Sequence, residues 1–100
     1  MRLSDLGPQV HFFVCANRRD ANSTLGPGCG DAGDALYDAL KKEVAHHREH
    51  ARVWVTKTAC MGICPSRGAT CARYPHARIF TEVEASDAAL LYTARDEKTP

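Results

Sequence analysis

The pattern of apolar and polar positions divides the chain into strands and helices. Segment 10–15 (VHFFVC) is rich in β-branched and aromatic residues and predicts a strand. Both of its faces are largely apolar, so we expect this strand to be covered on two sides. Segment 52–58 predicts a second strand, and segments 70–74 and 79–83 predict two short strands that pair antiparallel through a turn at 75–78.

Two helices complete the predicted order of strand, helix, strand, strand, strand, helix. The first runs from about residue 31 to His50, and Asp31 or Asp34 is expected to cap its start. Its core stripe recurs at every fourth residue: Leu36, Leu40 and Val44. The second helix is predicted over 84–94. Two further aromatic residues are expected in the core: Tyr37 and Trp54.

Composition limits the class of protein. One hundred residues predict a single domain, 1–100, with its folded core at about 10–94. The net charge of +1 does not support a nucleic-acid binder. The apolar run at 10–16 is too short to span a membrane, and no cleavage-site pattern follows it. We therefore expect no membrane partner and a reducing, cytoplasmic location, where clustered cysteines bind metals more often than they form disulfides.

The cysteines carry the candidate chemistry. Thirteen residues separate Cys15 from Cys29, and Cys29 ends the long polar loop 16–30 between two glycines. Cys60 and Cys64 follow in the short run CMGIC. Four thiolates from two loops can converge on one metal centre, and thiolates prefer iron–sulfur clusters and zinc to hard cations. The leading interpretation is a [2Fe-2S] cluster that carries single electrons, with two thiolates on each iron.

Two alternatives use the same residues. In the first, the four cysteines bind a structural zinc ion that holds the loops in place, and the protein is a binding or regulatory module. The Cys60–Cys64 spacing suits zinc, whereas the Cys15–Cys29 spacing does not. A thiol oxidoreductase could use Cys60 and Cys64, although three intervening residues, where redox motifs have two, weaken this idea. The fifth cysteine, Cys71, is expected to be a small buried residue on a strand. No nucleophile–base constellation points to an enzyme.

The residues around the last cysteine pair suggest how such a site would work. Gly62 can bend the CMGIC loop and turn amide N–H groups toward sulfur, which tunes the reduction potential. Met61 and Ile63 are expected to shield the site from water. Arg18 and Arg19, just after a candidate ligand, are either solvated loop residues or a basic rim that docks an acidic partner.

The motifs resemble those of a known family, the thioredoxin-like [2Fe-2S] ferredoxins. The matching stretches are FVCANRR at 13–19, GCGD at 28–31, TACMGIC at 58–64 and YP at 74–75. The resemblance covers about residues 10–94. It departs from the family pattern after the last cysteine, where the turn is longer and the following strand is more polar than the family's valine-rich strand.

The resemblance implies an α/β thioredoxin-like fold with a four-strand mixed sheet and two helices. It also implies a cluster held by Cys15, Cys29, Cys60 and Cys64, an electron-transfer protein that is not itself an enzyme, redox partner proteins that donate and accept electrons, and a homodimer. The four deprotonated cysteines and the cluster core would bring the net charge from +1 to −1, and to −2 after one-electron reduction. All-cysteine ligation predicts a potential on the order of a few hundred millivolts below zero.

Overall fold

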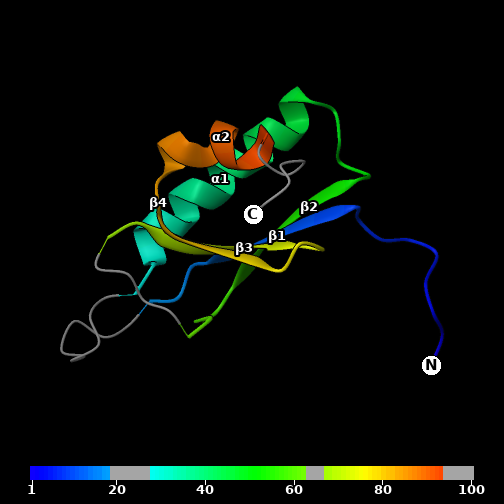
Figure 1. The fold of residues 1–100 in the computed structure, drawn as a ribbon, viewed down its shortest axis with the longest axis horizontal. Helices are drawn as coiled ribbons and strands as arrows, with labels where there is room; N and C mark the ends of the chain where they lie inside the picture. Colours follow the sequence, from blue (N-terminus) through cyan, green and yellow to red (C-terminus); the bar gives the residue numbers. More distant parts are fainter. Residues whose placement is uncertain (19–27, 63–66, 94–100) are drawn as a thin grey trace.

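The computed structural model describes residues 1–18, 28–62 and 67–93. The elements are β1 (Val10–Cys15), α1 (Gly30–His46), β2 (Val53–Thr58), β3 (Ala69–Tyr74), β4 (Arg78–Val83), the 3₁₀ turn η1 (Ala85–Asp87) and α2 (Ala88–Thr93). The strands form one sheet in the order β2-β1-β3-β4. β1 and β2 are parallel, and the other two pairs are antiparallel (Figure 1). The expected four-strand mixed sheet with two helices is confirmed.

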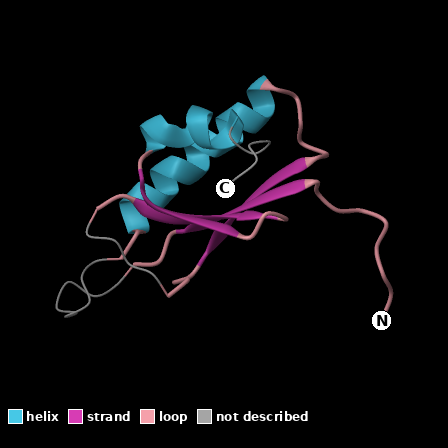
Figure 2. Cartoon of the chain, viewed as in Figure 1, coloured by secondary structure: helices cyan, strands magenta, loops and turns pink. Residues whose placement is uncertain are grey.

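Both helices lie on the same face of the sheet (Figures 1 and 2). α1 packs on β1, β2 and β3, and it also contacts α2 and η1. No described element covers the opposite face. The expectation that segment 10–15 is covered on two sides is therefore not met by the described part of the chain itself. None of the described helices is long and apolar enough to cross a membrane.

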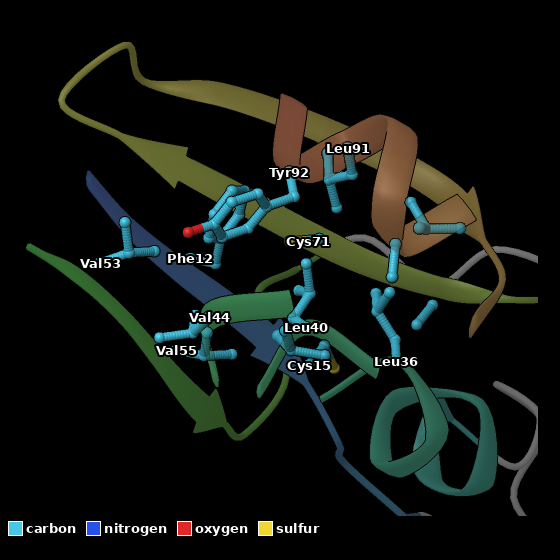
Figure 3. Packing of buried hydrophobic residues seen from close by; sticks show 14 of the residues in the cluster. Phe12, Cys15, Leu36, Leu40, Val44, Val53, Val55, Cys71, Leu91 and Tyr92 are labelled. Atoms are coloured by element: carbon cyan, nitrogen blue, oxygen red, sulfur yellow. The ribbon is translucent and has the colours of Figure 1, made fainter. Parts of the chain in front are cut away.

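The core lies between the helices and the sheet. The predicted stripe of α1 is correct, because Leu36, Leu40 and Val44 are all buried. Opposite them lie Phe12, which stacks on Tyr92 of α2 with ring centroids 6.2 Å apart, and the valines of β1 and β2 (Figure 3). Tyr37 packs at the edge of this cluster, as expected. Trp54 does not: it is 42 % exposed, on the uncovered face of the sheet.

α1 ends at His46, four residues before the predicted end. Arg48 adopts a left-handed conformation with φ of +54°, which stops the helix. The chain then turns so that the side chain of Glu49 is buried, where it accepts a hydrogen bond from the Tyr92 hydroxyl and lies 2.9 Å from Arg52. The contact with Tyr92 joins the end of α1 to α2.

Candidate metal centre

The topology places the candidate ligands at one edge of the sheet. β1 and β2 run parallel, so their carboxyl ends lie together. Cys15, the last residue of β1, pairs with Thr58, the last residue of β2. The N–H of Ala16 continues the ladder with a 3.0 Å bond to the Thr58 carbonyl. The turn that carries Cys60 therefore begins beside Cys15, as the sequence pattern requires.

Cys29 reaches the same edge from the start of α1. It is the N-cap residue of α1, and the N–H of Gly30 bonds the carbonyl of Asn17 at 2.9 Å. Cys15 and Cys29 are 0 % and 1 % exposed. Burial raises the pKa of the Cys29 thiol, hydrogen bonding from the backbone and hydroxyl of Thr70 opposes that rise, and the neighbouring Cys15 thiol adds to it. The two thiols are close enough to interact, so the structure brings these two predicted ligands together.

Gly33 makes this approach possible, although no motif in the sequence points to it. A Cβ at this position would lie 2.0 Å from the carbonyl oxygen of Cys15 and 3.0 Å from the Cα of Ala16. Only a glycine lets the first turn of α1 rest directly on the backbone at the end of β1. The available signal was a glycine inside a helical pattern, which often marks close packing.

Cys60 lies on an exposed turn, two residues after the end of β2. Gly62 has φ of +88°, and its N–H donates to Cys60 Sγ at 3.3 Å. This is the N–H···S arrangement that the glycine predicted. Met61 is half-buried against the core, and its expected shielding of the site stays a prediction. Cys64 and Ile63 lie outside the described residues. Across the described ranges, no three metal-ligating side chains form one group, so the four-cysteine ligand set stays a prediction.

The predicted cap of α1 is wrong, because Asp31 and Asp34 bind Arg18 and make no hydrogen bond to the backbone at the start of the helix. Arg18 lies 2.7 Å from Asp31 and 2.5 Å from Asp34, and Lys57 of β2 lies 3.2 Å from Asp34. Lys57 and then Arg18 hold the pKa of the Asp34 carboxyl below its usual value. These residues form an ionic clamp that joins the loop after β1, α1 and β2. Because Arg18 is paired, it is not a free basic rim; Arg19 lies outside the described residues.

Cys71 differs in kind from the three described candidate ligands. It is fully buried on β3, as expected, and burial raises the pKa of its thiol to about 12. It lies within β3, where it pairs with Val14 of β1, whereas Cys15 ends β1 and Cys29 caps α1. The donor set at the sheet edge does fit a soft metal centre. It offers two buried, adjacent thiols, a third on a glycine turn with an N–H aimed at sulfur, and Thr70 as a further hydrogen-bond donor.

Comparison with solved structures identifies the fold. A thioredoxin-like [2Fe-2S] ferredoxin from Aquifex aeolicus matches with a TM-score of 0.76 and 20 % identity, over 88 % of this chain and 85 % of that one. Another structure of a thioredoxin-like [2Fe-2S] ferredoxin from that organism matches with a TM-score of 0.78 and 19 % identity, over 91 % and 83 %. No protein-family model and no curated protein sequence matches the chain. The chain therefore has the fold of thioredoxin-like [2Fe-2S] ferredoxins, and the resemblance expected from its motifs is confirmed for the fold.

Proposed function

We propose that the protein is a one-electron carrier whose [2Fe-2S] cluster is held by Cys15, Cys29, Cys60 and Cys64. The observation that carries the proposal is the meeting of Cys15 and Cys29 at the edge of the sheet where β2 ends before Cys60, in a fold shared with [2Fe-2S] ferredoxins. When bound, such a cluster accepts and releases one electron without net bond changes in a substrate. The proposed role is therefore electron transfer, not catalysis.

The described residues would have different roles around the cluster. Cys15 and Cys29 are buried and exclude water from one side of the centre. The Cys60 turn is exposed, so electron donors and acceptors would approach there. The Gly62 N–H at Cys60 Sγ stabilises negative charge on sulfur and thereby favours the reduced state. We place the carrier in the cytoplasm, where thiols stay reduced, as part of the same proposal.

We further propose that the protein is a homodimer that pairs through the uncovered face of the sheet. The apolar strand β1 needs cover on both faces, and the described helices supply only one. The uncovered face carries Trp54, Tyr74 and Ile79, which are 42 %, 44 % and 47 % exposed. A two-fold interface brings each patch against its own copy, so like charges would repel. None of these residues is charged, which favours a second copy of the chain as the occupant.

The test of the carrier is anaerobic spectroscopy on purified protein. We expect visible absorption that bleaches with dithionite, an S = 1/2 electron paramagnetic resonance signal, and about two irons and two sulfides per chain. Cys60→Ser should change the signal or lose the cluster, whereas Cys71→Ser should leave both intact. Colourless protein that retains only zinc after anaerobic reconstitution would overturn the proposal and support the zinc-stabilised binding module. Disulfide reductase activity of metal-free protein would instead support the thiol oxidoreductase.

A further inference from the structure

The uncovered face of the sheet contains a groove of about 680 Å³. It is lined by His11, Phe13, Thr58, Met61, Ala72, Tyr74 and Ile79. All of these except His11 and Tyr74 are side chains that cannot ionise. Tyr74 stacks edge-on against Phe13 with ring centroids 5.8 Å apart, which gives the groove an aromatic floor. Among the described lining residues, His11 is therefore the one whose side chain ordinarily changes charge near neutral pH.

His11 lies on β1, one of the two inner strands of the sheet. Its ring stacks on Phe13 with centroids 3.9 Å apart and meets Trp54 edge-on at 5.6 Å. Its Nε2 atom lies 2.7 Å from Thr56 Oγ1, so one ring nitrogen already has a hydrogen-bond partner. Desolvation lowers the pKa of His11 below its ordinary value of 6.5, even with the face open. The site therefore favours the neutral imidazole.

The described elements packed around His11 provide no opposite charge. From β2 it meets Trp54 and Thr56, and from β3 it is paired with Tyr74, a residue with a phenol side chain. The charged side chains of the neighbouring strands point to the helix face. Lys57 binds Asp34 of α1, and Arg73 is buried beside Phe80 with 5.3 Å between the guanidinium carbon and the ring centroid. The N-terminal segment extends away from the sheet (Figure 1).

We propose that His11 makes the pairing of two copies through the uncovered face dependent on pH, with the dimer favoured when His11 is neutral. This inference rests on the proposed homodimer. A second copy would cover the groove and remove the remaining water from the imidazole, so a proton on His11 would be buried without a counter-charge. The two-fold axis would also bring two such charges to the same interface. Protonation therefore opposes pairing.

The sign and size of the effect follow from proton linkage. The monomer binds protons on His11 more readily than the dimer does, so the dissociation constant rises as the pH falls through the pKa of His11 in the monomer. Each dimer must release up to two protons to form. The dissociation constant should therefore rise by up to about 100-fold per pH unit once the pH is well below that pKa.

The experiment is sedimentation equilibrium of the cluster-loaded protein from pH 8 to pH 5.5, with the visible spectrum of each sample recorded to confirm that the cluster is intact. We expect a dimer at pH 8 that dissociates at lower pH. His11→Gln keeps a polar side chain beside Thr56 but cannot be protonated, and it should remove the pH dependence. The matched control is His76→Gln, at an exposed position in the β3–β4 turn, which should keep it.

A second measurement does not depend on any variant. Dilution calorimetry of the natural chain at pH 6, in two buffers with different ionisation enthalpies, should show proton uptake on dissociation. A dimer with the same dissociation constant at every pH, or a pH dependence that survives in His11→Gln, would overturn the role of His11. A protein that is monomeric at pH 8 would overturn the dimer as well, while dithionite reduction of the same sample tests the electron carrier separately.

Discussion

Gly33→Ala tests whether the packing of α1 on β1 sets the geometry of the candidate metal centre. The added Cβ would lie 2.0 Å from the Cys15 carbonyl oxygen, where ordinary contact begins at 3.4 Å. The first turn of α1 must therefore retreat by roughly 1.4 Å. The atoms that it meets belong to the backbone of Cys15 and Ala16, so no side-chain rotation can relieve the clash.

Two opposing effects decide the change in stability. Overpacking a tight contact costs about 1–3 kcal/mol. Alanine in a helix gains about 1 kcal/mol over glycine. We therefore expect the free energy of unfolding of the metal-free protein to fall by up to about 2 kcal/mol. Metal binding should suffer more, because Cys29 caps the same helix and would move away from Cys15, whereas a metal site needs its ligands held within about 0.5 Å.

The assay is iron and sulfide content after anaerobic reconstitution, together with chemical unfolding of the metal-free protein. Ala35→Gly is the matched control: Ala35 is exposed on α1, so the variant loses about 1 kcal/mol of helix propensity without moving Cys29. It should keep its iron, whereas Gly33→Ala should lose most of it. If Gly33→Ala binds iron as fully as the natural chain and has the same spectrum, this close contact does not set the geometry of the site.

Three further substitutions test individual contacts. Thr70→Val removes a hydroxyl donor to Cys29. A hydrogen bond worth about 1 kcal/mol corresponds to ~40 mV for one electron, so voltammetry should find the reduction potential of the cluster lower by that order. Thr70→Ser keeps the hydroxyl and should preserve the potential. Cys71→Ala should retain full iron content, because Cys71 is enclosed in the core within β3 and not at the edge of the sheet where Cys15 and Cys29 meet, and loss of iron would contradict this. Tyr92→Phe should lower the free energy of unfolding by about 1–3 kcal/mol in urea, because Glu49 loses a buried donor; an unchanged value would show that this bond is not needed.

The elements that were predicted best are those with strong local signals. The first strand was predicted at 10–15 and spans Val10–Cys15, because β-branched and aromatic residues fill it and polar residues bound it. The end of α1 was predicted four residues too late. The histidine-rich segment is compatible with a helix, and the helix stops because Glu49 turns inward to Tyr92, a partner 43 residues away that local sequence does not reveal.

Errors on the surface have a different cause. An alternating strand shows which residues share a face, but not whether another layer covers that face. Trp54 was therefore expected in the core and lies on the uncovered face of the sheet. The aspartates at the start of α1 suit a helix cap, but an arginine outside the helix competes for them, and Arg18 is brought there only by the folded loop.

The chemistry of the candidate site could be predicted from the sequence, but the residues that position its candidate ligands could not. Cysteine spacing predicted four ligands, of which the structure brings Cys15 and Cys29 together, and Gly62 predicted the N–H···S bond of the turn. Gly33 and Thr70 act through contacts between elements that are distant in sequence, so spacing could not assign their roles. The strand after the last cysteine is more polar than in the family pattern, and its Thr70 hydrogen-bonds to Cys29.

The charges around the candidate metal centre bear on how a redox partner would dock. The described cations near this edge each face a carboxylate: Arg18, Lys57 and Arg67. With a net charge of +1 before cluster binding, the chain presents little field to steer a partner from a distance. The approach would instead depend on the shape of the exposed Cys60 turn. We therefore expect electron-transfer rates to change little with ionic strength in stopped-flow reduction, and a rate that falls steeply with added salt would contradict this argument.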